Sequence, residues 1–130
     1  MEEMIYQKKR TVKVLHSGFY KGVPFVILNL GTHPTAYVEN IVQATNYNDS
    51  SLVDVDVHGG FTFCGKAHWE GKNTTGLEWL GWDYAHCWDF MGYYGPEDGT
   101  LYMLKKWSTE EILREVHFVI DQLLDLKQKK

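Results

Sequence analysis

The feature that most constrains the fold of this chain is an amphipathic pattern near the C-terminus, over residues 109–127. Ser108 is followed three residues later by Glu111, the spacing of a capping box, in which each side chain accepts the other residue's backbone N–H. Apolar residues then recur at the α-helical period, at Ile112, Leu113, Val116, Val119, Ile120, Leu123 and Leu124. A helix with such a stripe must bury it, so the rest of the chain has to supply a second layer.

The segments that precede this helix are typical of β-strands. Residues 11–15 and 24–30 are rich in Val, Ile and Leu and are separated by turn residues, which predicts a hairpin. Residues 53–57 alternate Val with Asp, the pattern of a half-buried strand, and further β-type runs occupy residues 36–38, 61–64, 77–84 and 101–104. We therefore predict an α+β fold, a mainly antiparallel sheet with one long C-terminal amphipathic helix packed on one face. At 130 residues, the chain fits a single domain over residues 1–130.

Composition and charge exclude several classes of protein. No apolar run approaches the ~18 residues of a membrane-spanning helix, and the start of the chain lacks the basic and apolar regions of a signal peptide, so we expect a cytoplasmic protein. Two cysteines, Cys64 and Cys87, are too few for a disulfide scaffold and are expected to be free thiols. Residues 36–104 hold two basic side chains against ten acidic ones, a net charge of −8, which disfavours extended nucleic acid and suits a cation or a neutral ligand.

The second half of the chain has the composition of a pocket. Nine of the twelve glycines lie between residues 59 and 99, and all five Trp residues lie between residues 61 and 107. Glycines let the backbone approach a ligand, and aromatic rings form pocket walls. An aromatic core joined by glycine turns would show the same composition, so both interpretations stay open at this point.

Two polar clusters in this region carry the candidate chemistry. They are residues 58–63, His-Gly-Gly-Phe-Thr-Phe, and residues 81–89, Gly-Trp-Asp-Tyr-Ala-His-Cys-Trp-Asp. Ionisable groups held among apolar side chains must find partners or shift their pKa values, which acid–base catalysis exploits. The candidate catalytic residues are His58, Asp83, His86 and Asp89, and the candidate ligand-binding residues are Gly59, Gly60, Thr62, Trp82 and Tyr84.

This assignment depends on local geometry. Asp83, His86 and Asp89 share a face only if a helical turn begins near Asp83, because in a strand His86 would point opposite to the two acids. The alternative is that Asp83 and His86 satisfy each other or nearby backbone groups, as buried polar pairs usually do.

Metal binding and thiol catalysis are weaker interpretations of the same residues. The candidate catalytic set offers nitrogen and oxygen ligands for a divalent ion, but no established metal-binding spacing occurs, so the cofactor and the metal stay unassigned. A Cys87 nucleophile activated by His86 is disfavoured, because adjacent side chains seldom converge.

The two clusters, in this order and followed by a terminal helix, resemble a family of small uncharacterised proteins common in bacteriophages and prophages. The resembling segments are residues 33–38, 58–63 and 81–86 with Asp89, together with the helix after Trp107. The family pattern runs Gly-Tyr-Val, then His-Gly-Gly-Leu-Thr-Tyr, then Gly-Phe-Asp-Cys-Ala-His with a nearby Asp, and Tyr84 replaces the family's Cys here. The resemblance implies a phage or prophage origin and a site built from His58, Asp83, His86 and Asp89.

The residues and the resemblance together suggest two functional classes. The first is a small hydrolase in which His58 or His86 acts as base, with a host nucleotide signal as substrate and an anti-defence role in the bacterial host cytoplasm. The second is a non-catalytic protein that retains a nucleotide or another small molecule among Trp and Tyr rings, or an interaction protein that masks a host factor. An anionic nucleotide would need basic contacts from residues 8–13, from Lys21 or from another subunit of an oligomer.

Overall fold

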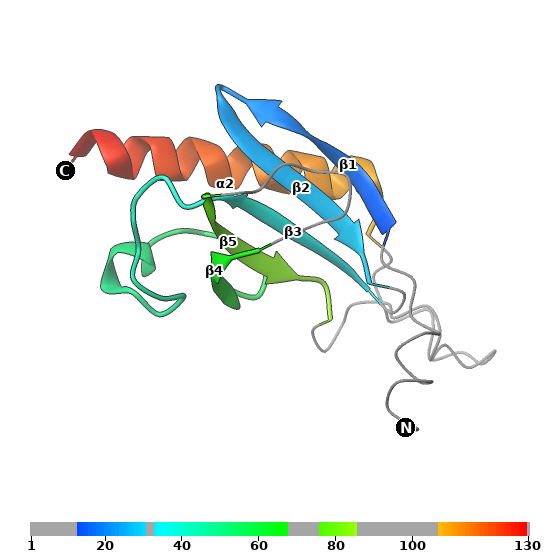
Figure 1. Cartoon of the computed structure of the whole chain (residues 1–130), viewed down its shortest axis with the longest axis horizontal. Coiled ribbons are helices and arrows are strands. Elements are labelled where there is room, and N and C mark those ends of the chain that lie inside the picture. Colours follow the sequence, from blue (N-terminus) through cyan, green and yellow to red (C-terminus); the bar gives the residue numbers. More distant parts are fainter. Residues whose placement is uncertain (1–12, 31–32, 68–75, 86–106, 130) are drawn as a thin grey trace.

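The protein forms a sheet of five strands covered on one face by a helix, as Figure 1 shows for the computed structural model. The structure describes residues 13–30, 33–67, 76–85 and 107–129. All strand pairs are antiparallel, in the order β1-β2-β3-β5-β4. The elements are β1 (Lys13–Tyr20), β2 (Val23–Asn29), β3 (Pro34–Glu39), η1 (Ser50–Leu52), β4 (Phe63–Lys66), β5 (Glu78–Asp83) and α2 (Thr109–Lys129). The predicted α+β fold is confirmed.

The order of the strands explains where the candidate site forms. β1 and β2 make the predicted hairpin, whose turn is confined to Lys21 and Gly22, both with positive φ. β3 pairs with β5 instead of β4, so residues 40–62 leave the sheet and return to it as the edge strand β4. In Figure 1 this connection loops out beside the C-terminal half of α2.

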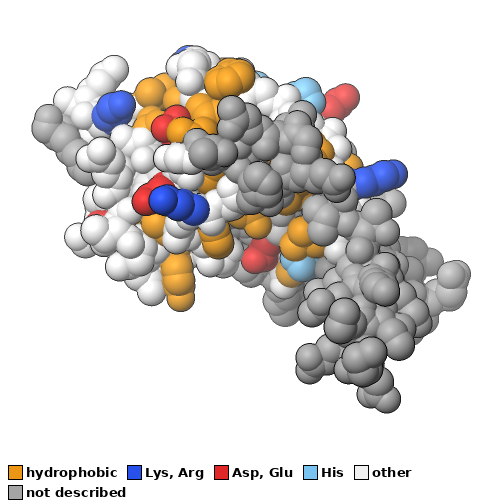
Figure 2. All heavy atoms as spheres, in the orientation of Figure 1, with side chains coloured by type: hydrophobic (Ala, Val, Ile, Leu, Met, Phe, Trp, Pro, Cys, Tyr) orange, Lys and Arg blue, Asp and Glu red, His pale blue; other side chains and the backbone are white. Residues whose placement is uncertain are grey.

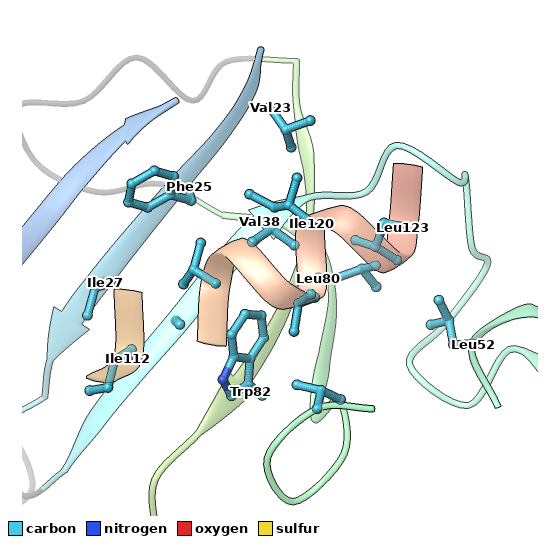
Figure 3. Close-up of a cluster of buried hydrophobic side chains, with 14 of the residues drawn as sticks. Val23, Phe25, Ile27, Val38, Leu52, Leu80, Trp82, Ile112, Ile120 and Leu123 are labelled. Carbon is cyan, nitrogen blue, oxygen red and sulfur yellow. The ribbon is translucent and has the colours of Figure 1, made fainter. Parts of the chain in front are cut away.

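The main core lies between α2 and the sheet. The helix begins with the predicted capping box, in which Ser108 donates its N–H to Glu111 Oε1 (3.0 Å) and Glu111 donates its N–H to Ser108 Oγ (3.1 Å). Figure 3 shows Ile112, Ile120 and Leu123 of the helix among side chains of β2, β3 and β5, with Leu52 of the connection at the right. The residues in this core that are fully buried include Ile27, Val38, Leu80, Ile112, Val116, Val119, Ile120 and Leu123.

The opposite face of the sheet holds a smaller apolar cluster around Val26, Leu28 and Trp79. There the Tyr37 ring lies over Gly81, its cross-strand partner, and meets the Phe63 ring edge to face at 5.6 Å. A Cβ atom at position 81 would lie 2.5 Å from Tyr37 Cδ2. Gly81 is therefore required by the close approach of a ring.

One predicted strand is wrong. Residues 53–57 pair with no strand, although Val57 is buried and Val55 is half-buried against the main core. The alternation matches the burial of Val55 and Val57 but not that of Val53, which is 78% exposed, and a loop that lies against a helix can bury alternate side chains as a strand does. The predicted strand at residues 101–104 lies outside the described residues, as do residues 11 and 12 of the first one.

Candidate functional site

The two sequence clusters meet in the fold because the first leads into β4 and the second ends β5. Thr62 donates its backbone N–H to the Gly81 carbonyl (2.9 Å), which continues the β4–β5 pairing by one residue. The Phe61 and Trp82 rings lie nearby, with centroids 6.0 Å apart at an angle of 73°. Residues 61–63 therefore lie directly beside the end of β5.

The His58 side chain packs among aromatic rings on the helix side of the sheet. It stacks on Tyr84 with ring centroids 4.6 Å apart and planes inclined by 12°, and it meets Trp107 edge to face at 4.9 Å. Tyr84 is fully buried, and its hydroxyl accepts a hydrogen bond from Trp82 Nε1 at 3.1 Å. His58 is half-buried by these contacts, so its ring is held in one orientation by packing.

Side chains of α2 hold the backbone next to His58. His58 donates its N–H to Glu115 Oε2 at 3.1 Å. Two turns further along the helix, Gln122 accepts the Asp56 N–H at 2.7 Å and donates to the Asp56 carbonyl at 2.8 Å. The amide of Gln122 thus pairs with residue 56 as a neighbouring strand would, and the helix replaces the missing strand partner of this segment.

Asp83 lies on the other side of the sheet from the His58 ring. Trp82 and Tyr84 belong to the core under α2, and successive side chains of a strand alternate between faces. Asp83 Oδ2 accepts a hydrogen bond from Thr62 Oγ1 at 3.3 Å, and its Oδ1 accepts the Ala85 N–H at 3.2 Å. Burial raises the pKa of Tyr37, and the negative charge of the nearby Asp83 raises it further. Asp83 is therefore paired with Thr62, a candidate ligand-binding residue, across β4 and β5.

His86 and Asp89 fall outside the described residues, so the four-residue catalytic assembly stays a prediction. β5 ends at Asp83, the position near which the assembly requires a turn. Among the described residues, no three His, Cys, Asp or Glu side chains come close enough to hold a metal ion. No helix in the described part of the chain is both long and apolar enough to span a membrane.

A groove of about 610 Å³ opens beside the first cluster, inside the connection between β3 and β4. Gly59 and Gly60 form one border with positive φ values of 69° and 82°, a conformation that favours glycine. The groove is mostly lined by apolar side chains and by the backbone of its own loop. Its lining residues are Tyr47, Asn48, Asp49, Ser50, Leu52, Val53, Val55, Val57, Gly59, Gly60 and Phe61. Gly59 and Gly60 were predicted from the sequence as ligand-binding residues, whereas the lining residues between positions 47 and 57 were not.

Asp49 organises the loop that forms the groove. Its carboxylate accepts the Thr45 N–H at 2.7 Å, the Thr45 hydroxyl at 3.0 Å and the Ser51 N–H at 3.0 Å, and so caps η1. These hydrogen bonds, with the Thr45 and Ser51 N–H groups first, hold the pKa of Asp49 well below its usual range. The polar run at residues 46–51 is typical of a loop, and the capped turn lies within it.

Cys64 is a free thiol beside the same connection. Its Sγ donates to the Ala44 carbonyl at 3.6 Å and accepts from Asn40 Nδ2 at 3.7 Å. Burial, with smaller contributions from Glu78 and Asp49, raises the pKa of this thiol. A thiol with a raised pKa is a poor nucleophile at neutral pH, which disfavours thiol catalysis by Cys64. Cys87 lies outside the described residues.

Figure 2 presents one face of the molecule, and on the described part of that face the Lys and Arg side chains lie apart from one another. They form no extended basic area there. Lys21 is held by Asp121 at 2.8 Å, and Lys129 by Asp125 at 3.0 Å.

Comparison of the chain with protein-family models, with curated proteins and with solved structures found no match. A function for this chain therefore has to be inferred from the geometry of the groove and of the rings around His58.

Proposed function

We propose that this protein binds a small molecule in the groove bordered by Gly59, Gly60 and Phe61. The observation that carries the proposal is the groove itself. Its volume of about 610 Å³ lies within the ~300–1,000 Å³ of small-molecule sites, and its walls combine apolar side chains with a few polar groups. The resemblance to phage and prophage proteins suggests a setting for this activity, the retention of a molecule made by the host.

Binding without catalysis is the better supported of the two functional classes. A general base has to reach the proton that it removes. The His58 ring is packed against Tyr84 and Trp107, and Asp83 lies on the opposite face of the sheet, bonded to Thr62. These two residues thus have contacts that a structural role explains, and the hydrolase hypothesis depends on His86 and Asp89.

The groove can be tested by filling it. Val53 lines it with 78% of its side chain exposed, so Val53→Trp should occupy the groove without disturbing the core. Val14→Trp is the matched control, because Val14 is an exposed valine on β1, outside the groove lining. The melting temperatures of the wild type and both variants are measured with a panel of nucleosides, cyclic and linear nucleotides and aromatic amines.

The proposal expects a panel member to stabilise the wild type and Val14→Trp, and to lose most of this effect with Val53→Trp. The compound is then recovered after denaturation and identified by mass spectrometry. Intact compound supports binding, whereas altered compound identifies the protein as an enzyme. Equal stabilisation of Val53→Trp would contradict the groove as the site, and no stabilisation by any panel member would count against small-molecule binding and favour a protein partner.

A further inference from the structure

The Asp, Glu, Lys and Arg residues of the loop that forms the groove are all of one sign. Residues 45–61, which form the loop around it, include three aspartates and neither Lys nor Arg. Asp49 lines the groove, and its carboxylate, which accepts hydrogen bonds from Thr45 and Ser51, is ionised at neutral pH as an aspartate ordinarily is. Asp54 and Asp56 flank Val55, another lining residue, and both are exposed. An anion entering this groove would meet unfavourable charge from each of these residues.

Lys129, a described lysine beside the loop, does not reverse this negative charge. Lys129 and Asp54 both line a smaller neighbouring hollow of about 250 Å³. Lys129 Nζ is, however, bound to Asp125 Oδ2 at 3.0 Å, and Asp125 lines the same hollow. The charge of this lysine is therefore matched by an acid of its own helix, and the loop aspartates remain in excess.

The rest of the groove is suited to an apolar body. Val53, Val55 and Val57 present branched aliphatic side chains from one segment, and Phe61 and Tyr47 add aromatic rings. Tyr47 is 47% exposed and Val53 is 78% exposed, so part of this apolar surface is in contact with solvent and open to a ligand. A planar or aliphatic group would bury it.

We propose that the ligand of this groove is a small organic cation, an amine carried on an apolar ring. The inference rests on the proposed function and narrows it, because it replaces the anionic nucleotide expected from the sequence with a ligand of opposite charge. The ring lies over the valines and the aromatic side chains, and the ammonium group lies toward Asp49, the loop aspartate that lines the groove, with Asp54 and Asp56 adding negative charge from farther away. This occupant satisfies both the apolar lining and the charge.

The test uses three compounds that share one ring and differ in charge: tryptamine, tryptophol and indole-3-acetate. Their dissociation constants for the wild type are measured by calorimetry at low salt and at 0.15 M salt. Tryptamine should bind tightest and indole-3-acetate weakest, with about a tenfold difference between the two extremes at low salt. Salt should shrink the difference, because screening at 0.15 M acts over ~8 Å.

Two variants locate the charge that matters. Asp54→Asn removes one acid from the loop and should reduce the preference for tryptamine over indole-3-acetate about threefold. Glu110→Gln is the matched control, since it removes one exposed acid from the first turn of α2, about three turns before Gln122, and Glu110 does not line the groove. This control should leave the preference unchanged.

The outcomes separate this inference from the proposed function. If indole-3-acetate binds as tightly as tryptamine or more tightly, and Val53→Trp abolishes that binding, the groove is a site but its ligand is not a cation. If Glu110→Gln changes the preference for tryptamine as much as Asp54→Asn does, that preference comes from the net charge of the whole protein and not from the loop aspartates. If none of the three compounds nor any nucleotide binds the wild type, the proposed function fails and the inference fails with it.

Discussion

Helix α2 holds two regions of this molecule by different means. Toward the sheet it presents an apolar stripe whose five buried residues, from Ile112 to Leu123, are in the main core. Toward the connection between β3 and β4 it presents Glu115 and Gln122, which bind the backbone of His58 and Asp56. The first region is held by a large buried area. The second is held by a few hydrogen bonds together with a smaller set of buried side chains, among them Leu52 and Val57.

The difference in magnitude implies a difference in dynamics. A buried aliphatic side chain contributes ~1.5–3 kcal/mol to folding, whereas a typical hydrogen bond contributes a net ~0.5–1.5 kcal/mol. The helix–sheet core should therefore open only when the whole protein unfolds. The loop that forms the groove should open locally at lower cost, as ligand-binding segments commonly do.

The largest effect is expected in the core. Val119→Asp places a charge at a fully buried position of α2, and it should reduce the free energy of unfolding by about 4 kcal/mol or more. Phe118→Asp is the matched control, because the neighbouring side chain is 48% exposed and the change should cost about 1 kcal/mol or less. Urea unfolding of both variants measures the contrast. Similar losses would show that α2 does not pack as described.

An intermediate effect is expected at the loop. Gln122→Ala removes both hydrogen bonds to the Asp56 backbone, so the Asp56 amide should exchange with solvent about tenfold faster, equivalent to roughly 1.4 kcal/mol of local opening. Amides of β2 and β3 should keep the exchange rates of the wild type. Hydrogen exchange by NMR checks both, with Lys127→Ala as an exposed control on the same helix. Equal acceleration in the strands would mean that loop and core open together.

The smallest effect is expected at low pH. Because hydrogen bonds lower the pKa of Asp49 in the folded protein, its ionised form stabilises the loop at every pH above the unfolded value of about 4. This stabilisation is lost as the pH falls below that value toward the folded pKa. The amide shifts of Thr45 and Ser51 should then move with pH in the wild type but not in Asp49→Asn. Shifts that persist in the variant would assign them to another acid.

Much of the fold could be predicted from the sequence because its signals are local. The capping box of Ser108 and Glu111, the period of the helix and the β-branched runs each depend on neighbouring residues, and each is confirmed where the structure describes it, apart from the strand predicted at residues 53–57. The prediction for residues 53–57 was wrong because it also used a local signal, which does not show what lies beside the segment in the fold. Val55 and Val57 face the core as the alternation predicts, whereas Val53 is exposed. The partner of this segment is Gln122, 66 residues from Asp56 along the chain.

The candidate site was predictable only in part. The hypothesis of a single site required the two clusters to be neighbours in the fold, and the bond between Thr62 and Gly81 brings the first cluster beside the end of β5. The face of the sheet on which each side chain lies could not be predicted from the sequence, because it depends on how far β5 continues before the chain turns. β5 continues to Asp83, which separates Asp83 from the His58 ring.

The sequence by itself determined the fold class, the start of the helix, the glycine turn at residues 59 and 60 and the acidic character of the loop, since each follows from residue type and spacing along the chain. The tertiary structure decided the stacking of His58 on Tyr84, the hold of α2 on the loop backbone and the groove itself. The physical reason is that these contacts join segments far apart in the chain. Such contacts form only when burial of the core has already fixed where the helix lies against the sheet.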